Sequence, residues 1–196
     1  MTQKGRQAMK KLLSIILMAC MIVTLTPIAC GGALTQGTAY AETSTELSSS
    51  NLSTHISNWD SKDDTLKLKA GSYQLTEDIT IDKTLEIIGT TTLDLNGHVL
   101  SLAQGKTGSV IKVTDGGLTL EDSNTSTEHK FSQTAEGQWY LNDINGTRTI
   151  TGGVITGGNN VENGGGVCVG VGKTFNMNGG TIFGCNAKHG GGIYIY

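Results

Sequence analysis

The stretch Thr151-Gly-Gly-Val-Ile-Thr-Gly-Gly-Asn159 recurs as Asn178-Gly-Gly-Thr-Ile-Phe-Gly-Cys-Asn186, and Glu162-Asn-Gly-Gly-Gly-Val-Cys-Val-Gly170 recurs as Lys188-His-Gly-Gly-Gly-Ile-Tyr-Ile-Tyr196. The two copies are 27 and 26 residues apart (152 to 179 and 164 to 190). Their short apolar runs are mostly β-branched or aromatic, which is typical of strands, and glycines between the runs permit tight corners. A repeat of this length and composition predicts a solenoid in which each repeat forms one coil of short strands.

The same kind of pattern extends upstream through residues 66–122. Apolar residues alternate there with period two, for example at Leu66 and Leu68 and, less clearly, at Val99 with Ser101. Antiparallel hairpins are an alternative explanation, since Asn96-Gly97 is a hairpin signal. The regular spacing and the absence of proline after Pro27 favour strands that are paired on both sides. We therefore predict an all-β fold, a right-handed single-stranded parallel β-helix of about five or six coils over residues 60–196.

Other segments complete the predicted domain organisation. Residues 42–51 are polar and rich in Ser and Thr, which predicts a disordered lead-in. Residues 52–59 carry apolar side chains at helical spacing and predict a short helix that caps the first coil, with Trp59 in the core. Residues 123–149 break the periodicity and predict a polar insertion, on the face where solenoids often bind ligands. The β-helix domain thus spans residues 52–196, with glycine-rich repeats at 151–196.

The repeat motifs resemble those of a known family. Gly-Gly-Val-Ile at 152–155 and Gly-Gly-Ile-Tyr at 191–194, with Phe175-Asn-Met-Asn178 and Phe183-Gly-Cys-Asn186, resemble the paired GG[AVIL][ILVY] and FxxN motifs of polymorphic outer-membrane adhesins and related pectate-lyase-like β-helix surface proteins. The resemblance covers about the last quarter of the chain. It implies a β-helix displayed outside the cell, and it carries over no catalytic residue.

Residues 1–41 predict an export signal. A basic segment that ends at Lys11 precedes an apolar run from Leu12 to about Ile28, and Ala39-Tyr40-Ala41 is a small-x-small cleavage site before Glu42. The alternatives are a retained membrane anchor and a lipoprotein modified at Cys20 or Cys30. We expect ordinary cleavage and a product that is secreted or displayed at the cell surface.

The charge and the cysteines of residues 42–196 limit the partners. This part contains ten of the 14 Lys and Arg and all 17 Asp and Glu, so its net charge is −7. A charge of that sign argues against nucleic acid, an anionic membrane or, unless calcium bridges the two, an acidic polysaccharide. Cys168 and Cys185 occupy different places in the repeat, and we predict buried free thiols.

Polysaccharide lyases and hydrolases also use parallel β-helices, so catalytic residues were sought. The only arginine after residue 41 is Arg148, without an acidic cluster nearby. Glu121 and Asp122 are adjacent in a strand and so point to opposite faces. Asp94 and Asp115 could lie on successive coils, 21 residues apart. His98 follows Asn96-Gly97, where a role in the turn is expected.

We therefore identify no catalytic, cofactor-binding or metal-binding residue from the sequence. The predicted function is that of an adhesin-like structural or carbohydrate-contacting module without catalysis of its own. The alternative is the N-terminal part of a β-helix lyase or glycoside hydrolase. The sequence ends within a repeat, which predicts a C-terminally incomplete solenoid whose edge pairs with downstream repeats or associates end to end. The repeats also predict that Asn159 stacks on Asn186, and that Ile182→Asp is severely destabilising.

Overall fold

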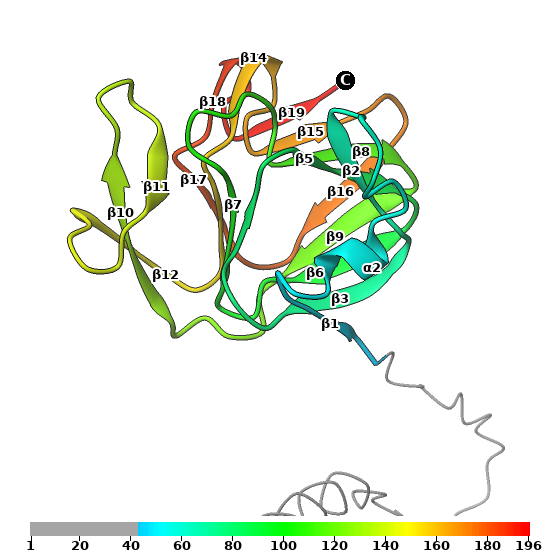
Figure 1. Cartoon of the computed structure of the whole chain (residues 1–196), viewed down its shortest axis with the longest axis horizontal. Helices are drawn as coiled ribbons and strands as arrows, with labels where there is room; N and C mark the ends of the chain where they lie inside the picture. The colour runs from blue at the N-terminus through cyan, green and yellow to red at the C-terminus, as the bar shows by residue number, and fades with distance from the viewer. Residues whose placement is uncertain (1–42) are drawn as a thin grey trace, which may run out of the picture. The chain divides into compact units, whose positions relative to one another are not determined.

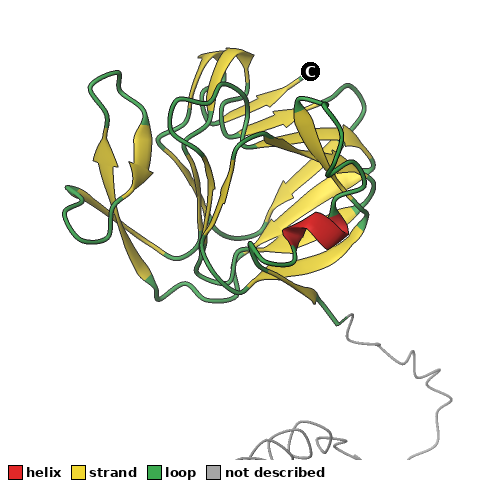
Figure 2. Cartoon of the chain, in the orientation of Figure 1, coloured by secondary structure: helices red, strands yellow, loops and turns green. Residues whose placement is uncertain are grey.

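The computed structural model describes residues 43–196, which form an all-β structure with one short helix (Figures 1 and 2). The predicted signal peptide and its cleavage site lie outside the described residues. No helix within residues 43–196 is long and apolar enough to cross a membrane. The all-β prediction is confirmed, and most of the strands lie in parallel sheets.

Three parallel sheets, here called A, B and C, account for most of the strands. Sheet A contains, in spatial order, β1 (Thr45–Leu47), β3 (Gly71–Leu75), β6 (Thr91–Asp94), β9 (Gly117–Glu121) and β16 (Thr174–Met177). Sheet B contains β2 (Thr65–Leu68), β5 (Thr84–Ile88), β8 (Ile111–Asp115), β15 (Val167–Val169) and β19 (Ile193–Ile195). Sheet C contains β4 (Ile79–Ile81), β7 (Val99–Leu102), β13 (Val154–Thr156) and β17 (Thr181–Phe183). From β2 to β9 the chain visits sheets B, A and C in turn.

Two smaller sheets complete the structure. Sheet D is a parallel pair, β14 (Asn159–Asn163) and β18 (Asn186–His189). The insertion sheet is antiparallel and consists of β10 (Glu128–Gln133), β11 (Trp139–Leu141) and β12 (Arg148–Thr151). Figure 1 shows the insertion sheet on the side of the molecule where β7 and β17 lie.

The core consists of aliphatic side chains stacked in register between neighbouring strands. In sheet B one stack is Leu66, Leu85, Ile111, Val167 and Ile193, and a second is Leu68, Ile87, Val113, Val169 and Ile195. All but the last member of each stack are buried. Because each strand places every second residue inward, period-two alternation produces these stacks, and each fully buried side chain contributes about 1.5–3 kcal/mol.

The strand register agrees with the register that the sequence repeat predicts. Val154 pairs with Thr181 and Ile155 with Ile182 in sheet C. Val167 pairs with Ile193, and Val169 with Ile195, in sheet B. Asn159 also pairs with Asn186, as the repeat predicts, and the two residues lie in the strands of sheet D.

Asn96-Gly97 forms a corner and not a hairpin. Both residues have positive φ (49° and 75°), a conformation that asparagine and glycine tolerate. The His98 amide donates to the Leu95 carbonyl at 2.8 Å and closes the turn. The strands on either side, β6 and β7, lie in different sheets and pair in parallel with other strands. The turn chemistry is that of a hairpin, but here it redirects the chain from sheet A to sheet C.

The N-terminal part of the described chain differs from the prediction in three respects. Residues 45–47 of the expected disordered lead-in form β1, which pairs with β3 and buries Leu47. The expected 52–59 helix is only α2 (Leu52–His55), because Ile56 is extended and bridges Leu68. Trp59 is 44% exposed and does not belong to the core. The helical spacing of the sequence predicts a helix that is too long, because the backbone of Ile56 pairs with Leu68 of sheet B and ends the helix there.

The 99–102 strand and the insertion also differ from the prediction. Leu100 and Leu102, and not Val99 and Ser101, belong to the main core, because they pair with Ile79 and Ile81. Val99 faces outward, where it packs with Phe131 of the insertion sheet and with Val154. The insertion, which was expected only to interrupt the periodic pattern, forms a sheet that covers the outer face of sheet C. All four residues of β7 are buried because both faces of the strand are covered.

Candidate functional site

A polar cleft of about 300 Å³ lies between the insertion and the turns that follow sheet C. We call it the insertion cleft. Its polar lining consists of the amide side chains of Gln104, Gln138, Asn159 and Asn186, the Glu136 carboxylate and the Thr134 hydroxyl. Glycine residues, including Gly158 and Gly184, form part of the wall. The cleft thus joins the two features that the sequence singled out, the insertion and the Asn159–Asn186 pair.

Hydrogen bonds from Gln138 hold the insertion side of the cleft in place. Its Oε1 accepts from the Gly105 amide at 3.0 Å, and its Nε2 donates to the Gly157 carbonyl at 2.9 Å. The Gln138 amide also donates to Thr134 Oγ1 at 3.2 Å, which tightens the β10–β11 turn. Both ends of the Gln138 side chain therefore connect the insertion to the loops beside sheet C.

Aromatic packing supports the cleft from beneath. The Trp139 ring lies 4.9 Å from the Phe183 ring, and the Phe131 ring lies 5.3 Å from Phe183, measured between centroids. Trp139 is half-buried against Phe183 of sheet C and is not a free platform for a ligand. A Cβ added to Gly184 would lie 2.6 Å from Trp139 Cβ, so the close packing requires glycine there.

Asp94 has a structural role at the Asn96 corner. Its Oδ1 accepts from the amides of Asn96 (2.9 Å) and Ser123 (2.8 Å), and its Oδ2 accepts from Gln74 Nε2 (2.8 Å). Burial by itself would raise the pKa of the Asp94 carboxyl, but the hydrogen bonds from Ser123, Gln74 and Asn96 together lower it. A carboxylate held ionised in this way stabilises the Asn96 corner and is poorly suited to be a general acid.

The other carboxylates considered for catalysis are separated. Asp115 ends a strand of sheet B, whereas Asp94 lies in sheet A opposite Glu121, so the two carboxylates, which could have stacked, lie in different sheets. Asp115 pairs with Lys173 Nζ at 2.8 Å, and this hydrogen bond lowers the pKa of the Asp115 carboxyl. Asp122 accepts from the amides of Gly97 and Gly153, both at 2.7 Å.

Two further sequence candidates have simple environments. Arg148 is exposed in β12, opposite Phe131 of β10. His98 follows the Asn96-Gly97 turn, as expected, and its Nδ1 lies 3.4 Å from Asp78 Oδ1. Neither side chain lines the insertion cleft.

Both cysteines in the described part of the chain are free thiols, as predicted. Cys168 is buried and Cys185 is half-buried. Burial raises the pKa of both thiols, that of Cys185 to about 11, so little thiolate forms at neutral pH.

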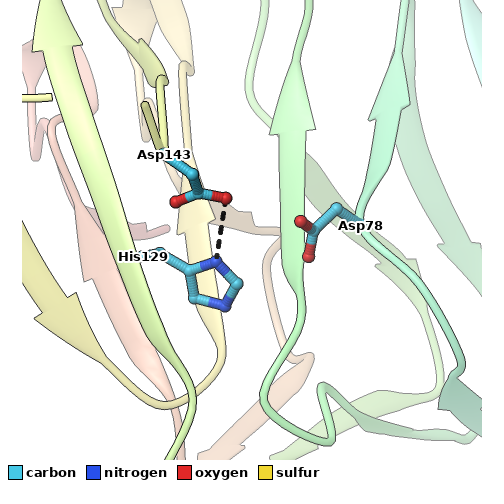
Figure 3. Close-up of side chains that lie close together, drawn as sticks. All are labelled: Asp78, His129 and Asp143. Atoms are coloured by element: carbon cyan, nitrogen blue, oxygen red, sulfur yellow. Dashed lines mark ion pairs between the residues drawn. The ribbon is translucent and has the colours of Figure 1, made fainter. Parts of the chain in front are cut away.

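Asp78, His129 and Asp143 form a cluster that the sequence did not reveal (Figure 3). Asp78 immediately precedes β4, His129 lies in β10, and Asp143 lies in the loop after β11. The three residues are spread over 66 positions and form no short motif, so only the docking of the insertion brings them together. The sequence pattern that could have indicated this cluster is a histidine in the polar insertion with an aspartate 14 residues later. That pattern is too common to be specific.

Searches against family models, curated proteins and solved structures find no match to this chain.

Proposed function

We propose that the chain is an exported, right-handed parallel β-helix that serves as a surface module and contacts an extracellular glycan at the insertion cleft. The repeated passage of the chain through sheets B, A and C supports the helical coiling. The export signal expected in residues 1–41 supports a location outside the cell. The resemblance of the glycine-rich repeats to those of surface adhesins supports the adhesin-like role.

The observation that carries the glycan proposal is the chemistry of the insertion cleft. Amide side chains offer a donor and an acceptor together, and Glu136 adds an exposed acceptor, which matches the mixed donors and acceptors of sugar hydroxyls. Because Asn159 and Asn186 occupy equivalent positions in neighbouring strands, the wall of the cleft carries the same amide side chain twice. The net charge of −7 on residues 42–196 and the Glu136 carboxylate favour a neutral or amino sugar over a uronate.

The interactions of the carboxylates support a function without catalysis. Asp94 and Asp122 accept hydrogen bonds from backbone amides at the corners, and Asp115 pairs with Lys173. We expect no release of unsaturated or reducing ends from pectin, polygalacturonate or neutral glycans. Reproducible turnover that is lost in Asp94→Asn or Asp115→Asn would favour the lyase or hydrolase alternative.

A glycan array probed with the purified chain tests the binding site. Retained glycans are then titrated by calorimetry against Asn186→Ala and Glu136→Ala, both exposed in the cleft. Each variant removes one or two hydrogen bonds, so we expect about a tenfold weaker affinity. Asn176→Ala is the matched control, because Asn176 is an exposed amide on sheet A away from the cleft. The proposal fails if no glycan is retained, or if the three variants bind equally well.

A second surface, the outer edge of β16, β17 and β19, is the proposed site of association with further strands. These strands each end their sheet, and Met177, Ile193, Ile195 and Tyr196 are exposed there. Unpaired strand edges with apolar side chains are templates for pairing. We propose that further repeats or a second copy cover this edge. Sedimentation should show self-association of the chain, and an appended polar coil should abolish it; a stable monomer at high concentration contradicts the proposal.

A further inference from the structure

Asp78, His129 and Asp143 bring three potential metal ligands together where the insertion meets the edge of sheet C. One ligand atom from each residue lies within 4.8 Å of the other two. Figure 3 shows the His129 ring and the Asp143 carboxylate on one side and the Asp78 carboxylate facing them from the other. His129 is only 3% exposed, whereas both aspartates are exposed to solvent. The cluster therefore has a buried nitrogen at its base and an open side.

The hydrogen bond at the far side of the ring determines the tautomer of His129. Its Nε2 lies 2.7 Å from the Gly97 carbonyl oxygen. A carbonyl oxygen can only accept, so Nε2 must carry the proton and donate it. In the neutral imidazole the Nδ1 atom then has a lone pair, and this lone pair is on the side of the two carboxylates.

The Nδ1 atom of His129 is buried and has no hydrogen-bond partner among the described residues. The nearest oxygen on the insertion side, Asp143 Oδ2, lies 3.9 Å away, too far for a hydrogen bond. A lone pair directed at ionised carboxylates is unfavourable unless a positive charge lies between them, and a buried unpaired polar atom costs about 1–3 kcal/mol. The geometry thus calls for a cation at this point.

Each of the three side chains is held by the main chain, as ligands of a metal usually are. Asp78 Oδ1 accepts from the Val99 amide at 2.8 Å, and Asp143 Oδ1 accepts from the Lys130 amide at 2.8 Å. His129 Nε2 donates to the Gly97 carbonyl. Such outer hydrogen bonds fix the tautomer and orientation of metal ligands. They leave His129 Nδ1 and Asp143 Oδ2 directed toward the centre of the cluster.

We propose that Asp78, His129 and Asp143 bind a divalent transition-metal ion, Zn²⁺ being the best match. An imidazole nitrogen with carboxylate oxygens suits zinc, whereas calcium takes oxygen ligands. Zinc bonds of about 2.0–2.2 Å place the donors roughly 3.3 Å apart. The ligand atoms now lie within 4.8 Å of one another, and rotation of the exposed carboxylates can bring them to the shorter zinc spacing. Solvent would complete the coordination. The ion would join Asp78, beside sheet C, to the insertion that carries His129 and Asp143.

Metal titration of the purified chain after treatment with EDTA tests this site. We expect one Zn²⁺ per chain by calorimetry, weaker binding of Ca²⁺, and a higher melting temperature with zinc. In a ¹⁵N–¹H spectrum of the histidine rings, zinc should shift the Nδ1 resonance of His129 and leave its Nε2 protonated. Glycan binding is not needed for any of these measurements, so this proposal and the proposed function fail independently.

Asp143→Asn and Asp78→Asn remove the charges while an amide oxygen can still accept from the Lys130 and Val99 amides. Each should weaken zinc binding by at least about tenfold. Asp82→Asn is the matched control, since Asp82 is an exposed aspartate at the other end of β4. This variant should bind zinc as tightly as the unmodified chain. His129→Gln should abolish binding, with circular dichroism as the check that the variant is folded.

Three results would overturn the proposal. The first is the absence of stoichiometric zinc binding by the unmodified chain at 100-fold molar excess. The second is binding that persists unchanged in Asp78→Asn and Asp143→Asn, which would place the ion at another histidine. The third is protonation of His129 Nδ1 at neutral pH without any effect of zinc, which would make the cluster an imidazolium–carboxylate group only.

Discussion

The parallel sheets and the insertion sheet solve the same problem, the burial of apolar side chains, in different ways. In sheets A, B and C a strand packs on strands of the same kind one repeat away, so Ile155 contacts Leu100 and Ile182 at equivalent positions. In the insertion sheet the strands are antiparallel neighbours in sequence, and Phe131 is buried against Val99 and Val154 of sheet C. The first arrangement repeats a local rule, whereas the second depends on one specific docking.

We therefore expect a core substitution in the parallel sheets to destabilise several strands, and a substitution in the insertion sheet to destabilise mainly the insertion. Removal of one residue from a stack disturbs the strands on both sides, because the same stack runs through several strands. Loss of an insertion contact should detach a sheet that is paired only with itself.

Ile155→Asp should prevent folding or lower the free energy of unfolding by more than about 4 kcal/mol. It places an unpaired charge among fully buried aliphatic side chains. Ile182→Asp should cost less, since Ile182 is only partly buried at the edge of sheet C; this modifies the expectation of a severe effect. Urea denaturation checks both, with Ile155→Val as a control that costs about 0.5–1.5 kcal/mol. Equal midpoints for the two aspartate variants would refute the edge position of β17.

Phe131→Ala should cost about 3–5 kcal/mol in the stability of the insertion, because it empties a fully buried site. Hydrogen exchange is the measurement: amides of β10–β12 should exchange faster, while those of β5 and β8 stay protected. Ile144→Ala is the matched control, since Ile144 is 86% exposed in the same insertion. Uniform loss of protection in all sheets would show that the insertion is part of one cooperative unit.

Gly184→Ala should cost about 2–3 kcal/mol. The residue has φ +62°, and an added Cβ would collide with the Trp139 side chain. Gly172→Ala separates the two causes, since Gly172 has φ +69° but no atom within 4 Å of an added Cβ, so only the backbone cost of about 1 kcal/mol remains. Thermal denaturation compares the variants. Equal destabilisation would mean that Trp139 does not press against this turn.

Asp94→Asn should cost about 1–2 kcal/mol at pH 7, because charged hydrogen bonds at the Asn96 corner become neutral. The pKa of Asp94 is lower in the folded than in the unfolded chain. Its stabilisation is therefore complete above the ordinary carboxyl pKa and is lost as the pH falls below about 4. Urea denaturation at pH 7 and pH 3 should show the gap between variant and wild type shrink at pH 3. A gap that is independent of pH would contradict the role of the carboxylate.

The parallel pairing and its register, from Val154 with Thr181 to Val169 with Ile195, could be predicted from the amino-acid sequence alone. Repeats at a fixed offset and period-two alternation are local properties, and a strand that stacks on its own repeat needs no further information. The sequence could not show that residues 45–47 form a strand, since their polar composition hides a pairing with β3.

Three features depend on packing between distant segments: which face of β7 points inward, where the insertion docks, and which polar residues lie close together. Val99 can be buried on the outer side because Phe131 covers it, and that contact spans 32 positions of sequence with no repeat to align it. The insertion cleft and the Asp78–His129–Asp143 cluster arise from the same docking. Their residues come from separate segments, and the physical reason is general: a site formed by side chains from distant segments depends on packing, which no local pattern records.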